Sequence, residues 1–137
     1  MPEAVLSSAK TDQQLASIVD DLLAQPDPVL FTRLAAEQFD TLDGYAQAKM
    51  AYDPVSQTAI MHGSLPTRPG RVAVVAAGTS DHQVAAEAAR TLQFSGVAAD
   101  MIVDVGVAGI WRLQARLDDI RAADIVIAVA GMDAAIV

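Results

Sequence analysis

The chain has 137 residues, which is enough for one ordinary domain or two small ones. Apolar residues make up 53% and charged residues 19%, so the chain can build a core and is not disordered by composition. The net charge of −8 argues against nonspecific binding to DNA or RNA, because Lys and Arg must neutralise the phosphates there. The sequence has no cysteine, which excludes disulfides, thiolate metal sites and a cysteine nucleophile within it.

Neither a leader-like start nor a membrane-spanning stretch is recognisable. The first residues do not form a basic segment followed by an apolar one, and no run of about 18 apolar residues occurs. We therefore expect a soluble, cytoplasmic protein with no nucleic-acid or membrane partner.

The first 62 residues predict a small α/β unit. Residues 1–10 carry no strong signal and are expected to form an arm. Thr11 and Gln14 form a capping box, so a helix is predicted to begin there and to end at Pro26. Its apolar side chains recur at helical spacing: Leu15, Ile18, Val19, Leu22 and Leu23.

A strand over residues 29–32 and a second helix over residues 35–42, ending near Gly44, are predicted next. Residues 47–52 and 57–61 then read as two short strands, joined by a turn that contains Pro54. Residues 63–70 hold two Pro and two Gly and little to bury, which predicts a linker between two domains.

Residues 71–137 show a regular alternation of strands and helices. Strands are predicted over residues 72–77, 101–103 and 124–130. A helix over residues 81–95 is closed by Gly96, and its inward face is expected to hold Val84, Ala85, Ala88 and Leu92. A helix over residues 110–122 is expected to turn these side chains inward: Ile110, Leu113, Leu117 and Ile120. This βαβαβ order predicts a parallel sheet with right-handed crossovers.

Three polar or glycine-rich loops follow the three predicted strands, and parallel strands would gather them at one edge of the sheet, where open α/β folds bind ligands. The first is Gly78, Thr79, Ser80 and Asp81. The second holds Asp104, Gly106, Val107, Ala108 and Gly109. The third is Gly131, Met132 and Asp133. Because the first loop opens a helix, its backbone N–H groups predict a site for an anion such as phosphate. A helix cap without any ligand is the alternative.

Two further side chains are ambiguous. Asp104 stands at the expected ligand edge, where a carboxylate can move protons or hold magnesium, although a solvated loop acid is equally common. Arg112 can reach a phosphate, but its spacing to Arg116 and Asp119 also suits ion pairing along one surface face of a helix.

At these loops the sequence resembles the LarB family, which makes a nickel-pincer cofactor and contains a domain similar to PurE, the carboxyaminoimidazole ribonucleotide mutase. The matching motifs are residues 72–81, 104–110 and 128–132. The resemblance extends back to Pro2, Lys10, Thr11 and residues 29–33 and 52–54. It implies a flavodoxin-like, PurE-like fold over residues 71–137, of which this sequence holds the N-terminal part.

The resemblance implies carboxylation of the pyridinium ring of nicotinic acid adenine dinucleotide by CO2 or bicarbonate. Hydrolysis of the phosphoanhydride then releases AMP, with Mg²⁺ as the expected cofactor and a homo-octamer as the expected assembly. By matched motif, residues 78–81 would hold the phosphate and ribose of the substrate. Asp104 and residues 106–109 would line the pyridinium or CO2 pocket, and residues 131–133 would close its third side. Asp104 and Asp133 are the implied catalytic acids.

The sequence departs from the family pattern after the third strand. The family has Gly-Met-Glu-Gly-Ala-Leu-Pro, whereas Asp133, Ala134 and Val137 stand here at the Glu, second Gly and Pro positions. The family's attacking cysteine is absent, so we expect a truncated or partial protein. A PurE-type mutase is one alternative, which the lack of a His in residues 106–109 disfavours. A nonenzymatic module for nucleotide binding or oligomerisation is the other.

Overall fold

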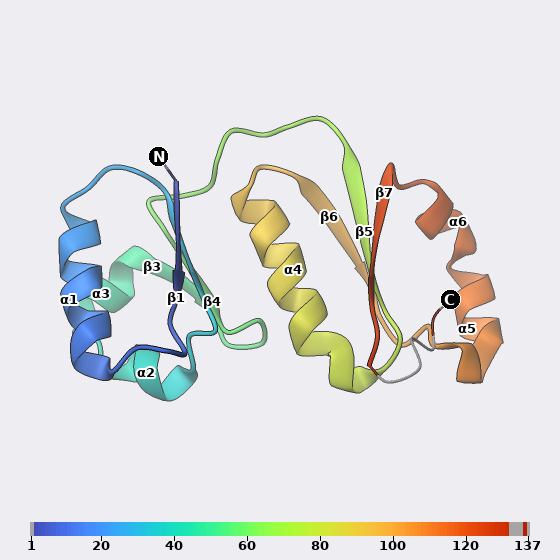
Figure 1. The fold of residues 1–137 in the computed structure, drawn as a ribbon. Coiled ribbons are helices and arrows are strands. Elements are labelled where there is room, and N and C mark those ends of the chain that lie inside the picture. Colours follow the sequence, from blue (N-terminus) through green and yellow to red (C-terminus); the bar gives the residue numbers. More distant parts are fainter. Residues whose placement is uncertain (1, 132–135, 137) are drawn as a thin grey trace. The chain divides into compact units, whose positions relative to one another are not determined.

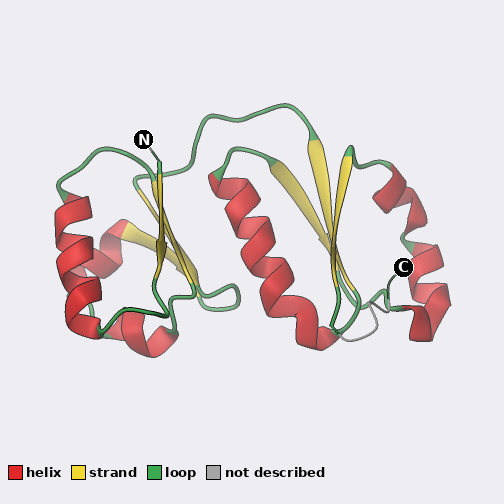
Figure 2. Cartoon of the chain, in the orientation of Figure 1, coloured by secondary structure: helices red, strands yellow, loops and turns green. Residues whose placement is uncertain are grey.

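The computed structural model describes residues 2–131 and 136. Its contacts divide the chain into two compact units, Met1–Leu65 and Pro66–Val137, and the division lies within the stretch predicted to be a linker. Each unit packs helices against a β-sheet, so the chain has the predicted α/β class (Figures 1 and 2). Among the described residues, no helix is both long and apolar enough to cross a membrane.

The N-terminal unit is built on a four-stranded sheet with the order β1-β2-β4-β3. Strands β1 (Glu3–Leu6) and β2 (Val29–Thr32) pair in parallel. Strands β3 (Met50–Asp53) and β4 (Thr58–Met61) form the predicted antiparallel hairpin, and β4 also pairs with β2.

Helix α1 (Asp12–Leu23) begins at the predicted capping box. The Thr11 hydroxyl accepts a hydrogen bond from the Gln14 N–H at 3.2 Å, and the Gln14 side-chain oxygen accepts one from the Thr11 N–H at 3.0 Å. The apolar face of α1 lies in a core with Phe31, Leu34 and Met61. This helix therefore matches the prediction in its start, its end and its buried face.

Two predictions for this unit are wrong. Residues 3–6 form an edge strand that pairs with β2 and not an arm, and Val5 alone of the four is buried. Residues 44–49 form helix α3 (Gly44–Lys49), where the start of a strand was predicted. The Asp43 carboxylate caps that helix by accepting hydrogen bonds from the N–H groups of Tyr45 and Ala46 at 2.8 and 2.9 Å.

Helix α2 (Ala36–Asp40) lies within the predicted second helix and packs on the hairpin. The Phe39 and Tyr52 rings stack with their centroids 4.3 Å apart, and the Tyr52 hydroxyl donates to the Leu34 carbonyl at 3.0 Å. Burial raises the pKa of Tyr52, and the nearby carboxylates of Asp40, Glu37 and Asp53 raise it further.

The C-terminal unit is a parallel sheet of three described strands with the order β6-β5-β7. They are β5 (Arg71–Ala76), β6 (Ala98–Ile102) and β7 (Ile125–Val129). Helix α4 (His82–Phe94) covers one face, and α5 (Ile110–Ala115) and α6 (Leu117–Arg121) cover the other (Figure 1). Placing the first strand between the second and third is the beginning of a flavodoxin-like order.

The central strand β5 is buried on both faces, as a parallel strand requires. Val74 and Ala76 pack toward α4 with Ala85, whereas Ala73 and Val75 pack on the other face with Ile102 and Val105. This alternation explains why the sequence shows β5 as a continuous apolar run.

The helix predictions in this unit need correction at three positions. Val84 is 52% exposed, because it lies about 100° around α4 from Ala85. Ile110 is 47% exposed at the first turn of α5 and does not face inward. The predicted helix over residues 110–122 is broken at Arg116, whose φ and ψ of −114° and 5° are not helical. Strand β6 also begins before the predicted 101–103, at Ala98.

Candidate functional site

Backbone hydrogen bonds join the loops that follow the three strands of the C-terminal unit. The Ala77 N–H donates to the Val129 carbonyl at 3.0 Å, which extends the pairing of β5 and β7. The Gly106 N–H donates to the Ala77 carbonyl at 2.9 Å, and the Val105 N–H to the Ala76 carbonyl at 3.3 Å. The carboxyl ends of the strands are therefore held together by the main chain, whatever side chains they carry.

An open cleft of about 420 Å³ lies at this edge and collects residues from all three loops. Its lining residues are Ala77, Gly78, Thr79, Ser80, Asp81, Asp104, Gly106, Ala108, Arg112 and Gly131. Of the predicted site residues, Val107 and Gly109 do not line the cleft. Met132 and Asp133 lie outside the described residues.

The first loop enters α4 through a single 3₁₀ turn, Thr79–Asp81. The Asp81 carboxylate accepts a hydrogen bond from the Gly78 N–H at 3.0 Å, so it closes the loop on itself. Helix geometry leaves the first N–H groups of the turn without an intrahelical partner, and no other described residue accepts a hydrogen bond from Thr79 or Ser80 N–H. Among the described residues, these two donors therefore have no acceptor, and the acid of the same loop is already engaged.

On the opposite wall, Asp104 and Arg112 form an ion pair, with Asp104 Oδ2 and Arg112 Nη1 3.3 Å apart. Asp104 has a φ of +60°, in the left-handed region that few residues other than glycine adopt. The Arg112 side chain lies over Gly109, where an added Cβ would come within 2.7 to 2.8 Å of the guanidinium. The Arg112 guanidinium carbon is also 5.8 Å from the centre of the Trp111 ring.

The sequence left two alternatives for Arg112, namely contact with a phosphate and ion pairing on a surface face of the helix. The predicted ion pair on the surface face of the helix forms between Arg116 and Asp119 at 2.7 Å, whereas Arg112 pairs with Asp104. Arg112 instead lines the cleft, one helical turn after Gly109. The sequence signal for Arg112 was a cation three residues after a glycine at the start of a helix. No sequence signal pointed to Asp104 as its partner. Ala77, which also lines the cleft, was not predicted.

The electrostatics of the described cleft combine one cation, Arg112, with two carboxylates, Asp81 and Asp104. Within the described residues, no group of three or more His, Cys, Asp or Glu is placed to hold a metal ion. Magnesium is usually held by one or two carboxylates together with substrate phosphates, so this donor set fits a magnesium ion that arrives with a phosphate.

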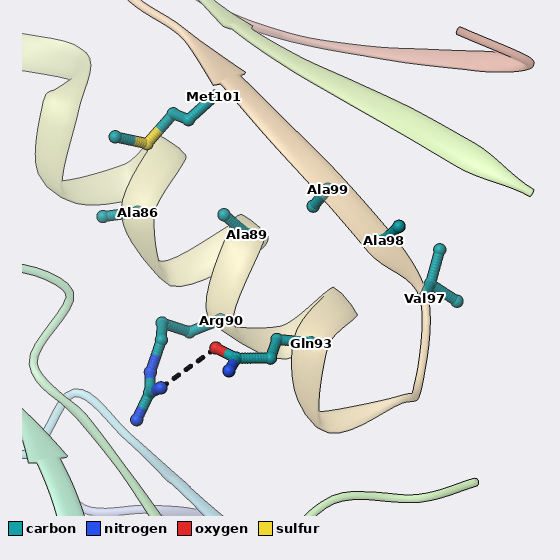
Figure 3. A pocket seen from close by; sticks show the side chains of 8 residues that line it. All are labelled: Ala86, Ala89, Arg90, Gln93, Val97, Ala98, Ala99 and Met101. Carbon is teal, nitrogen blue, oxygen red and sulfur yellow. Dashed lines mark hydrogen bonds between the residues drawn. The ribbon is translucent and has the colours of Figure 1, made fainter. Parts of the chain in front are cut away.

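A second hollow of about 350 Å³ lies between α4 and β6 (Figure 3). Its walls are mainly alanine methyl groups and Met101, and the Arg90 guanidinium at its rim donates to the Gln93 side-chain oxygen at 3.0 Å. No residue of the three loops lines it. It therefore offers a small apolar surface and none of the chemistry predicted at the strand ends.

Comparison with known proteins places the first unit. Residues 1–63 match the LarB/PurE-like N-terminal domain. An uncharacterized protein of Methanocaldococcus jannaschii is 46% identical over 69 residues, which cover 49% of this chain. The match spans 27% of that relative's length.

Proposed function

We propose, from the match of residues 1–63 to the LarB/PurE-like N-terminal domain, that the chain serves the carboxylation of nicotinic acid adenine dinucleotide. The pyridinium ring loses a proton and gains a carboxylate from CO2, supplied as such or by dehydration of bicarbonate, and attack of water on the phosphoanhydride releases AMP. The product is a biscarboxylated pyridinium mononucleotide on the route to a nickel-pincer cofactor.

The observation that carries the proposal is the cleft at the carboxyl ends of β5, β6 and β7. It presents the N–H groups of Thr79 and Ser80 on one wall and the Arg112 guanidinium on the other. Backbone N–H groups at a helix start and an arginine fork are both suited to phosphate oxygens. A dinucleotide with a central pyrophosphate is a ligand of matching charge.

In this proposal the chain's own residues bind and orient the dinucleotide. Thr79 and Ser80 bind the pyrophosphate, and Gly131 lets the ligand approach the backbone of the third loop. Asp104, which lines the cleft, would accept the proton that the pyridinium ring loses. Asp81 and Asp104 are the carboxylates that would hold a magnesium ion together with the phosphates, where it would neutralise their charge. The cysteine that the family resemblance implies as the attacking nucleophile is not in this sequence. The proposal therefore requires a thiolate supplied from outside this sequence.

The test is a calorimetric titration with nicotinic acid adenine dinucleotide, in which NAD serves as the matched ligand control because it lacks the ring carboxylate. We expect the acid form to bind more tightly. Absence of binding at millimolar ligand would refute the proposed substrate.

Thr79→Pro tests the Thr79 N–H as a donor, because it removes this N–H at a position where the backbone accepts proline. Gly78 before it is extended, with φ and ψ of −127° and 170°, and the first position of a helix accepts proline. A hydrogen bond to a charged group contributes about 1.5–3 kcal/mol, so binding should weaken by roughly 10- to 100-fold. Thr79→Ala keeps the N–H and is expected to bind nearly as the parent does.

A nonenzymatic nucleotide-binding module is the second candidate, favoured by the absence of a cysteine. Incubation with the dinucleotide, Mg²⁺ and bicarbonate separates the two when AMP is measured by chromatography. Release of AMP favours the enzyme. Equal affinity for ATP and for the dinucleotide favours the module.

We also propose that the chain forms a homo-oligomer, as its resemblance to PurE-like proteins implies, and that it works in the cytoplasm. A mass measurement in solution tests the first point, and a clean monomer over a range of concentrations would contradict it.

A further inference from the structure

The cation of the cleft is already neutralised by an acid of the same cleft. Arg112 and Asp104 pair at 3.3 Å, and their side chains are 42% and 48% exposed. An ion pair in contact with water contributes little to stability, so exchange of either partner costs little. An anion that enters the cleft therefore meets an arginine whose partner is replaceable.

We infer that Asp104 is a built-in competitor for the anion site of Arg112 and thereby determines which anions the cleft accepts. An incoming anion must displace the Asp104 carboxylate from the guanidinium before it binds. A pyrophosphate presents several charged oxygens and displaces it, whereas a singly charged carboxylate gains little over Asp104. This inference rests on the proposed function, because it concerns how the same cleft selects its ligand.

Two features of the backbone keep this competitor in place. Asp104 is held at a φ of +60°, a conformation that Asp and Asn adopt more readily than other side chains. Gly109 leaves room for the guanidinium, since an added Cβ would lie 2.7 Å from its nearest nitrogen. Gly109 itself has a φ of −129°, so alanine is compatible with its backbone. Gly109→Ala thus moves Arg112 without removing its charge.

Trp111 gives a direct signal for the exchange. It is the single tryptophan of the sequence, 67% exposed, and its ring lies 5.8 Å from the Arg112 guanidinium carbon. A shift of Arg112 from Asp104 to a bound anion changes the surroundings of this ring. Trp111 emission is therefore measured during titration with inorganic pyrophosphate in the absence of Mg²⁺, so that Asp104 acts on the anion only through Arg112. Calorimetry on the same samples gives an independent affinity.

The decisive variants are Asp104→Asn and Asp104→Gly, both of which tolerate the left-handed backbone. If Asp104 competes, each binds pyrophosphate about two- to fivefold more tightly than the parent, the range expected for a half-exposed ion pair. Asp119→Asn is the matched control, because it removes the same charge from the exposed pair with Arg116, outside the cleft lining. It should leave the affinity unchanged.

Gly109→Ala and Arg112→Gln are expected to weaken pyrophosphate binding. The inference is overturned if Asp104→Asn and Asp104→Gly bind pyrophosphate as the parent does or more weakly, or if Asp119→Asn tightens binding equally. It is also overturned if neither the parent nor Asp104→Asn binds pyrophosphate at 10 mM, roughly the weak limit of specific binding. A parent that binds pyrophosphate but not nicotinic acid adenine dinucleotide refutes the proposed substrate alone. A parent that binds the dinucleotide, with unaltered affinity in every Asp104 variant, refutes the competition alone.

Discussion

Asp81 provides a sharp test of how the first loop of the cleft is held. Its carboxylate accepts the Gly78 N–H at 3.0 Å, across the turn that leads into α4. If Asp81 holds this turn through its bond to the Gly78 N–H, Asp81→Ala destabilises the C-terminal unit before any ligand is present. If it acts only on a ligand, the same variant melts like the parent.

The expected size follows from the bond. A hydrogen bond to a charged group is worth about 1.5–3 kcal/mol. Because the Gly78 N–H is part-buried and water replaces some of the lost bond, we expect Asp81→Ala to cost about 1–2 kcal/mol. Asp81→Asn keeps a neutral acceptor and should lose roughly half of that, since charge-assisted bonds are about twice as strong as neutral ones.

Urea unfolding followed by Trp111 fluorescence measures this loss in the correct unit. The only tryptophan of the sequence lies in the C-terminal unit, so its emission reports the unfolding of that unit. With a slope of about 1–2 kcal/mol per molar urea, the midpoint for Asp81→Ala should fall by roughly 0.5–2 M. Asp119→Ala removes a carboxylate from an exposed ion pair and should shift it far less. Equal midpoints for the two alanine variants would refute the role of Asp81 in holding this turn.

Three further predictions concern local structure. Tyr52 has a raised pKa in the folded state, so its stabilising contribution is complete below its unfolded pKa of 10.0 and is lost as the pH rises through the folded value. Tyr52→Phe should flatten alkaline denaturation above pH 10 while losing about 1 kcal/mol at pH 7 with its bond to Leu34, as circular dichroism would show. Thr11→Ala removes the capping box of α1 and should lower the unfolding free energy of the N-terminal unit by about 1 kcal/mol. Gly96→Ala places a side chain at a φ of +77° and should cost about 1–2 kcal/mol, measured by Trp111 fluorescence in urea.

The elements that could be predicted from the sequence are those whose own residues carry the signal. Strand β5 is an apolar run because it is buried on both faces, and α1 has both its cap and its apolar stripe in one segment. Strand β1 could not be found, because it is an edge strand in which only Val5 is buried and its stability comes from pairing with β2. The strand propensity of these residues does not reveal the strand with which they pair.

The candidate site also has a part that the sequence predicts and a part that it does not. The gathering of three loops at one edge follows from the parallel topology, which the alternation of strands and helices predicts. The partners of its charged groups do not follow, because they depend on side-chain positions within the loops. Asp104 has a φ of +60° and pairs with Arg112, and no spacing rule gives this contact. The bond from the Gly78 N–H to Asp81 has the spacing of one half of a capping box, although Gly78 lacks the side chain that would complete the motif.

The cleft therefore combines a fixed frame with replaceable charges. The frame is the main-chain bonding of Ala77 to Val129 and of Gly106 to Ala77, which no ligand needs to break. The charges are paired within the cleft before a ligand arrives, with Asp81 on a backbone N–H and Asp104 on Arg112. Binding of an anion is then an exchange of partners on a rigid edge. Its selectivity depends on how strongly the resident acid holds the arginine, because a weaker hold would admit any small anion and a stronger one would exclude the pyrophosphate as well.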